Sequence, residues 1–315
     1  MRAEIGAGAI EWQQIATYSP QWWRYASSPW RLTSRLFRDG FHCLAKLSSG
    51  HFVGAAPGAI VTLNPGETEF QVSHKVLRGT RPLHIAATPD GHLYWGEYFD
   101  NSARAEVHIY ASTDCGAAWN VVYTFPSGAI RHVHNVIHDP WQNCLWILTG
   151  DDGPECRIIR ASFDFKSVET VLSGSQQARS AAAVPAEQGL YFSSDTPLEK
   201  NSVYCLDRHG NLGTLTELNG SSIYGCRVGS ALFFSTMVEP GKVNRDRTVC
   251  VFGSLDSRDW QRVLEWKKDL WPMRFFQYGN AVLPDGMNTT EFLAVSAIAV
   301  HPGDRETSIW RMCAG

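Results

Sequence analysis

The chain has 315 residues and a formal net charge of −3 without a basic block, which argues against a nucleic-acid partner. No apolar run reaches the roughly 18 residues that a transmembrane helix needs, and Glu4 and Glu11 interrupt the apolar core that a secretory signal would have. The eight cysteines form no CxxC pair, so we expect mostly buried thiols in a reducing cytoplasm.

Five segments repeat one pattern, an apolar strand followed by a short polar turn and a second apolar strand. They begin near residues 81, 130, 176, 222 and 270. The first four end on an acid, at intervals of 54, 44 and 44 residues: Glu97, Asp151, Asp195 and Glu239. A period in this range predicts an all-β fold, a β-propeller with one blade per repeat.

The stretch 35–80 is one more unit of similar length, so we predict a single six-bladed propeller domain over residues 1–315. The predicted blades are 35–80, 81–129, 130–175, 176–221, 222–269 and 270–312. The last unit lacks an outer strand, and we expect residues 10–18 to supply it and so close the ring. Seven blades, five blades and an irregular pair of β-sandwiches remain alternatives.

Residues 112–119 read Ser-Thr-Asp-Cys-Gly-Ala-Ala-Trp, in which the Asp can bond backbone N–H groups of its own turn and the Trp can pack into a blade. The segment resembles the Asp-box of sialidases and related BNR-repeat proteins. Ser112, Asp114, Gly116 and Trp119 match that box, whereas Ala118 replaces the usual Thr. A degenerate copy occupies 254–260. In the resembling families the box lies between outer strands, so we expect it to be structural.

A longer stretch, residues 90–240, resembles an uncharacterised group of bacterial BNR-type propellers associated with surface-polysaccharide gene sets. This resemblance implies a connection with carbohydrate. The chain departs from true sialidases, because it lacks their N-terminal arginine motif and no Tyr–Glu nucleophile pair can be assigned. Nor does it contain a P-loop, a dinucleotide fingerprint or a nucleophile elbow.

In a propeller blade the innermost strand begins, and the second strand ends, on the same face of the ring. We therefore expect the four acids to meet there as candidate catalytic groups, next to Gly96 and Gly150, which would leave room for a ligand. The candidate substrate-binding residues on the same face are Arg131, His132, His134, Arg179, Arg274, His84, Tyr224 and Gln176. Flat faces for sugar rings are offered by Trp95, Tyr98, Trp141, Tyr224 and Trp271.

Paired carboxylates suit glycosyl transfer or hydrolysis, in which one protonates the leaving oxygen and another activates water or attacks the anomeric carbon. We expect Asp151 to act with Glu239 or Glu97, while the arginines orient an anionic group of a bacterial polysaccharide or its precursor. The alternatives are a non-catalytic glycan-binding or scaffold propeller, whose acids form structural ion pairs, and a metal-dependent lyase or hydrolase. No cofactor is expected apart from a divalent metal, which His132 and His134 would hold.

Overall fold

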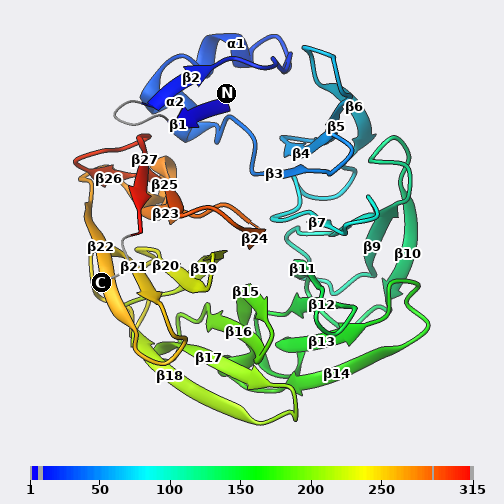
Figure 1. The fold of residues 1–315 in the computed structure, drawn as a ribbon, viewed down its shortest axis with the longest axis vertical. Helices are drawn as coiled ribbons and strands as arrows, with labels where there is room; N and C mark the ends of the chain where they lie inside the picture. Colours follow the sequence, from blue (N-terminus) through cyan, green and yellow to red (C-terminus); the bar gives the residue numbers. More distant parts are fainter. Residues whose placement is uncertain (1, 6–9, 286, 313–315) are drawn as a thin grey trace.

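The computed structural model describes residues 2–5, 10–285 and 287–312. Six β-sheets stand in a ring around a central axis (Figure 1), which confirms the prediction of a six-bladed β-propeller. Each sheet is antiparallel between successive strands and runs outward from this axis. The innermost strand of the fourth sheet, Ser180–Ala186, consists of small, fully buried residues, because neighbouring blades crowd together near the axis.

The first three blades contain four strands each. In chain order these are β3 (Cys43–Lys46), β4 (Phe52–Ala56), β5 (Ala59–Leu63) and β6 (Gln71–Lys75); β7 (Ala86–Ala87), β8 (Leu93–Gly96), β9 (Val107–Ser112) and β10 (Asn120–Phe125); β11 (Val133–Asp139), β12 (Cys144–Thr149), β13 (Arg157–Ala161) and β14 (Val168–Ser173). Outer strands such as β14 are mostly solvent-exposed on one side, whereas β12 is buried on both faces.

The last three blades contain β15 (Ser180–Ala186), β16 (Gly189–Ser194), β17 (Asn201–Asp207) and β18 (Leu212–Leu218); β19 (Ser222–Val228), β20 (Ala231–Thr236), β21 (Thr248–Ser254) and β22 (Gln261–Lys268); and β23 (Asn280–Val282), β25 (Phe292–Ile298) and β27 (Thr307–Arg311). Two short strands from the sixth unit, β24 (Met287–Asn288) and β26 (Val300–His301), join β19 and β22 of the fifth sheet.

Hydrophobic contacts bind each blade to the next. One buried cluster joins Val107 and Ile109 of the second blade to Val136 and Ile147 of the third. Corresponding clusters join the first blade to the second, the third to the fourth, the fourth to the fifth and the fifth to the sixth. The core therefore lies between sheets, and no blade buries its apolar faces alone.

The prediction that residues 10–18 complete the sixth blade is wrong. Strand β2 (Ile10–Gln13) pairs with β1 (Arg2–Ile5) in a separate two-stranded sheet. Further along, Thr17 pairs with Glu69 of the first blade, where Thr17 donates to Thr68 O and accepts from Phe70 N. The backbone groups of this segment are thus hydrogen-bonded within a local hairpin and to the first blade, and not to the sixth blade.

The two ends of the ring are held instead by ion pairs. Arg35 on α2 (Arg31–Leu36) is only 2% exposed, and its guanidinium contacts Asp269 and Asp304 as well as the carbonyl of Phe276. Arg31 pairs with the same Asp304 from a more exposed position. A helix that precedes the first blade is thereby fixed to the segments that follow β22 and β26.

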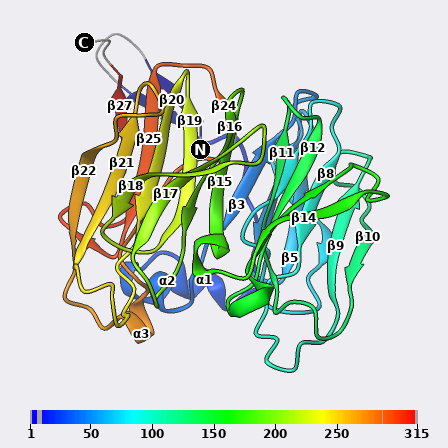
Figure 2. The same cartoon turned by 90° about the horizontal axis from the view of Figure 1, so that it is seen from below.

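The short helices occupy one face of the disc. Figure 2 shows α1 (Arg24–Ser27), α2 and α3 (Met273–Phe276) along its lower edge. The 3₁₀ turns η1 (Gly153–Glu155) and η2 (Gln176–Ala178) connect β12 to β13 and β14 to β15. We call this the helical face; it holds the starts of the innermost strands and the ends of the second strands. Within the described ranges, none of the helices has the length and apolar character to traverse a bilayer.

The Asp-box segment forms the turn between β9 and β10. Ser112 Oγ donates to Asp114 Oδ1 at 2.7 Å and accepts from Gly116 N, while Asp114 Oδ1 accepts from Ala118 N. The Trp119 indole packs edge-on against Trp95. Equivalent Ser–Asp bonds occur in the corresponding turns of the fifth blade, at 254–256, and of the third, at 162–164. Because β9 runs antiparallel to β8, this turn lies opposite the helical face, so its role is structural.

Candidate functional site

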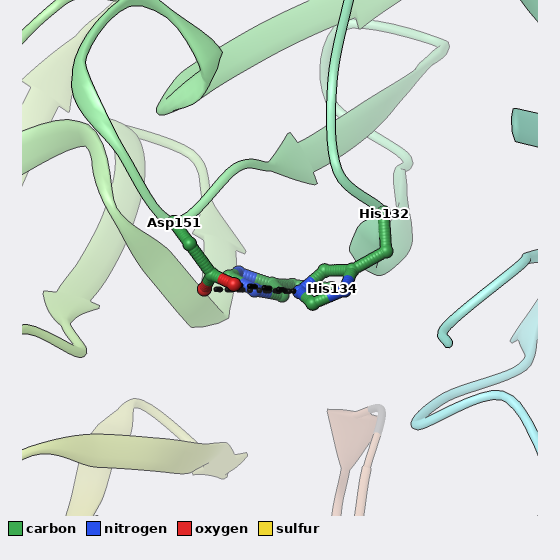
Figure 3. A group of neighbouring side chains, drawn as sticks. All are labelled: His132, His134 and Asp151. Carbon is green, nitrogen blue, oxygen red and sulfur yellow. Dashed lines mark hydrogen bonds and ion pairs between the residues drawn. The ribbon is translucent and has the colours of Figure 1, made fainter. Parts of the chain in front are cut away.

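Asp151 is the centre of the candidate site. It follows β12 through Gly150, whose φ of +98° turns the chain over the helical face. The Asp151 carboxylate lies 3.2 Å from Arg131 Nη1, 3.2 Å from Arg179 Nη2 and 3.4 Å from the Nε2 atoms of His132 and His134. Figure 3 shows the carboxylate pointing at the two imidazoles. We call these five residues the Asp151 cluster.

The two histidines present their Nε2 atoms to each other. His132 Nδ1 lies 3.0 Å from the carbonyl of Phe99, and His134 Nδ1 lies 2.9 Å from the carbonyl of Ser180. Since a carbonyl can only accept, each neutral ring carries its proton on Nδ1. Both Nε2 lone pairs then face one another at 3.0 Å and also face the carboxylate. These three side chains are close enough together to act as ligands of one metal ion.

The histidines and arginines around Asp151 keep its carboxylate ionised. Burial raises the pKa of its carboxyl, but hydrogen bonds with His132 and His134, and their charge when protonated, outweigh burial and hold the pKa below its usual range. Arg131 also pairs with Asp100 at 2.7 Å, so this guanidinium is shared between two carboxylates. Asp151 is therefore suited to remain an anion at the centre of the site.

Asp195 and Glu239 flank the Asp151 cluster and have the opposite tendency. Burial, followed by interaction with other carboxylates, raises the pKa of both acids, although the charge of Arg179 works against the rise. Glu239 is half-buried after β20, whereas Asp195 is buried after β16. The site thus combines a carboxylate held ionised with two carboxyls that retain protons more readily, which is the division that acid–base catalysis uses.

Three buried polar atoms in this region have no hydrogen-bond partner in the described part of the chain: Arg131 Nε, Arg179 Nε and Asp195 Oδ1. Buried donors and acceptors are normally satisfied, so unpaired ones gathered at one place indicate a site for a polar ligand. Tyr98 adds a flat ring whose centroid lies 4.3 Å from that of His132. Burial, helped by Asp151, raises the pKa of Tyr98 to about 12, so its hydroxyl remains a donor.

Two residues that bind the predicted site residues were not predicted from the sequence. Ser221 hydrogen-bonds with Asp195 and Glu239, and Asp100 pairs with Arg131. Both lie in turns directly before or after strands whose ends were assigned to this face. The alternation of strand and turn could have located them, although their chemistry is too common to single them out.

The structure does not bring Glu97 into the Asp151 cluster. Both carboxylate oxygens of Glu97 bind the guanidinium of Arg78, and one also accepts from His108 N at 2.8 Å. The neighbouring glycines serve packing rather than ligand access. A Cβ at Gly96 would lie 2.4 Å from Val133, and one at Gly150 would lie 2.1 Å from the backbone of Glu155. Glu97 is thus held in a structural ion pair with a residue of the connection from the first blade to the second.

Three other predicted ligands lie elsewhere on the ring: His84, Tyr224 and Arg274. His84 Nδ1 pairs with Asp285 at 3.0 Å and packs edge-on against Tyr224, forming a separate group beside the channel. Arg274 is exposed on α3 with its guanidinium over Phe275. Gln176 does belong to the site, because its Nε2 lies 3.5 Å from Asp151 O.

The central channel contains a cavity of about 530 Å³. Its lining includes His84, Asn135 and Asp285, and it extends along the innermost strands as far as Trp141, at the opposite end of β11. Trp141 and the His84 group are therefore channel residues, whereas Trp95 is 1% exposed and belongs to the core. Asn135, which follows His134 in β11, is the lining residue nearest in sequence to the Asp151 cluster.

No family model matches the chain, and no curated protein matches it. Solved structures with a similar fold include a nidogen/laminin complex (14% identity, TM-score 0.54, 78% of this chain and 85% of that chain). The WD40 repeats of RRP9 align with 14% identity and a TM-score of 0.55 over 87% of this chain and 80% of that chain. An oligogalacturonate lyase from Vibrio parahaemolyticus aligns with 9% identity and a TM-score of 0.51 over 74% and 71%. These similarities show that the chain has a propeller fold.

Proposed function

We propose that this propeller is an enzyme that hydrolyses or transfers glycosyl groups of an anionic bacterial polysaccharide or its precursor. The observation that carries the proposal is the convergence of Asp151, Asp195 and Glu239 with Arg131 and Arg179 at one end of the channel. The carboxyls supply acid–base groups, while the unpaired Nε atoms of the arginines supply donors for an anionic substituent.

Glu239 is the best placed general acid, because it is half-buried and its pKa is raised, first by burial and then by Asp195. In this mechanism Glu239 gives its proton to the glycosidic oxygen as the bond from that oxygen to the anomeric carbon breaks. The ionised Asp151 attacks the anomeric carbon and forms a glycosyl ester. Glu239, now ionised, takes a proton from water or an acceptor hydroxyl, whose oxygen adds to the anomeric carbon and releases Asp151, so both acids return to their starting states.

Two further features support this setting. The Ser112–Asp114 turn and its copies support membership of the BNR/Asp-box superfamily, for which we infer a carbohydrate role. The cysteines within the described residues are free thiols, which supports a cytoplasmic location and hence a step in surface-glycan assembly.

Turnover of uronate-containing and neutral oligosaccharides by the wild type and by Glu239→Gln tests the proposal. We expect turnover of an anionic substrate, with kcat lowered about 10²- to 10⁴-fold in Glu239→Gln and binding retained. Glu217→Gln, which changes an exposed acid paired with Lys200, is the matched control and should leave kcat unchanged. Binding without turnover in the wild type would contradict the proposal and favour a glycan-binding propeller.

A metal-dependent lyase or hydrolase is the second candidate, favoured by the facing Nε2 atoms of His132 and His134. Two imidazoles and the Asp151 carboxylate form a donor set that suits Zn²⁺ or Mn²⁺, although the two guanidinium groups beside Asp151 oppose a cation. Elemental analysis of protein purified without chelator distinguishes the two candidates. Metal that is lost in His134→Ala would favour this one, whereas metal-free protein unaffected by added Zn²⁺ or Mn²⁺ would exclude it.

A further inference from the structure

Large apolar side chains are exposed along the helical face. Trp22 is 84% exposed, Trp30 71% and Leu270 97%. Tyr25, Trp271 and Phe275 are also exposed in the same segments. We call these six residues the aromatic face. Single exposed apolar residues are ordinary, but six large ones in two segments that pack together mark an interaction surface.

The two segments form one continuous surface. Arg35 on α2 donates to the carbonyl of Phe276 at the end of α3, and α1, α2 and α3 lie along the same edge of the disc in Figure 2. The rings of Trp271 and Phe276 meet at 5.2 Å, and Lys268 donates to the carbonyl of Trp271. The exposed side chains are therefore presented by a firmly packed base.

The charge of this surface is opposite to that of the whole chain. Residues 19–39 and 267–279 contain seven Lys and Arg but only two acids, whereas the chain has a net charge of −3. Both acids are consumed internally, because Asp39 pairs with Arg24 and Asp269 pairs with Arg35 and Lys268. Three exposed cations make no ion pair within the described residues: Arg38, Lys267 and Arg274.

We propose that the aromatic face docks the protein onto a bilayer surface that contains anionic lipids. Trp and Tyr favour the membrane interface, where the ring enters the apolar boundary and the polar atom stays hydrated. Nearby Lys and Arg side chains are attracted to an anionic leaflet. The side chains protrude singly from short helices and turns, which suits insertion into a fluid interface.

Docking through this face turns the candidate site toward the bilayer. The Asp151 cluster lies where β12 ends and β11 begins, on the same side of the ring as α3, which leads into β23. A substrate carried on a lipid would then meet the channel from the membrane side. The docking itself needs no turnover, so it goes beyond the proposed function and can be tested separately.

Co-sedimentation with vesicles tests the proposal. We expect the wild-type chain to bind vesicles of phosphatidylcholine mixed with phosphatidylglycerol, and to bind pure phosphatidylcholine much more weakly. The double variant Trp22→Ser/Leu270→Ser should lower the partition coefficient at least about tenfold, because it removes two side chains that would be buried in the interface. Arg38→Gln/Arg274→Gln should reduce the preference for the anionic lipid, and high salt should do the same.

Leu255→Ser is the matched control. Leu255 is 64% exposed in the turn after β21, and since β21 is antiparallel to β20, this turn lies on the opposite face. The control should bind like the wild type, and so should Glu239→Gln, because docking does not depend on turnover. Absence of wild-type binding to the mixed vesicles, or equal binding by Trp22→Ser/Leu270→Ser, would overturn the proposal. So would lipid-free self-association that this double variant abolishes, because the face would then be a dimer interface.

Discussion

Asp195 has a raised pKa, caused first by its burial and then, more weakly, by Asp151. A folded-state pKa above the unfolded value means that the folded protein binds the proton more tightly. The stability that this provides is complete below the ordinary pKa of Asp and is lost as pH rises through the raised pKa. At neutral pH the ionised Asp195 therefore lowers the free energy of unfolding. Such a cost is typical of a buried carboxyl that a protein retains for its function.

Asp195→Asn should consequently stabilise the protein by about 1 kcal/mol at pH 7, because the amide keeps the shape of the carboxyl and avoids burying its charge. The gain should shrink as pH is lowered toward the ordinary pKa of Asp. Urea denaturation across this pH range measures it. A variant that is less stable than the wild type at pH 7 would show instead that ionised Asp195 is needed as a partner for Arg179.

The meeting of Asp151 with His132 and His134 could be predicted because it depends only on strand direction. When one strand ends on a face of the ring and the adjacent strand begins on that face, their terminal residues lie close together. This holds whatever the side chains are. Glu97 has the same place in its repeat, yet its carboxylate binds Arg78. The partner of a buried acid depends on which long basic side chain lies close enough to bind it. The repeated pattern of strands and turns does not predict which side chain that is.

Asp139 at the end of β11 ties two blades together. It is fully buried, accepts from the Trp146 indole within its own blade and pairs with Arg208 of the fourth blade. Its other oxygen accepts backbone N–H groups of the turn that starts at Pro140. A single carboxylate therefore fixes a turn, a core indole and a neighbouring sheet.

Asp139→Ala should destabilise the fold by about 3–5 kcal/mol, because it removes the buried carboxylate that pairs with Arg208 and leaves the Trp146 indole N–H without its acceptor. Glu169→Ala provides the contrast, since Glu169 pairs with Arg160 at the surface and should cost at most about 1 kcal/mol. Thermal unfolding of the two variants measures the difference. Equal losses would mean that the connection between these blades depends on apolar packing alone.

At the scale of the element, six units could be predicted because their apolar strands recur, but the pairing of residues 10–18 could not. Apolar and polar residues alternate in this segment, and such a pattern can pair with any free sheet edge. Its actual partners are Arg2–Ile5, adjacent in sequence, and the edge of the first blade near Glu69. Local pairing closes a smaller loop than pairing with the far end of the chain, so it loses less chain entropy.

At the scale of the whole molecule, Arg35 determines how the ring is closed, because it lies between segments more than 230 residues apart in the sequence. Arg35→Met should lower the free energy of unfolding by about 3–5 kcal/mol, since Asp269 and Asp304 would lose a buried cation while the side-chain volume is nearly kept. Arg31→Met removes a second partner of the same Asp304, but Arg31 is half-exposed, so this control should cost at most about 1 kcal/mol. Urea denaturation monitored by Trp fluorescence compares the two. If Arg35→Met proved as stable as Arg31→Met, the ion pairs could not be what holds the sixth blade beside the first, and ring closure would depend on the packing of α2 against α3.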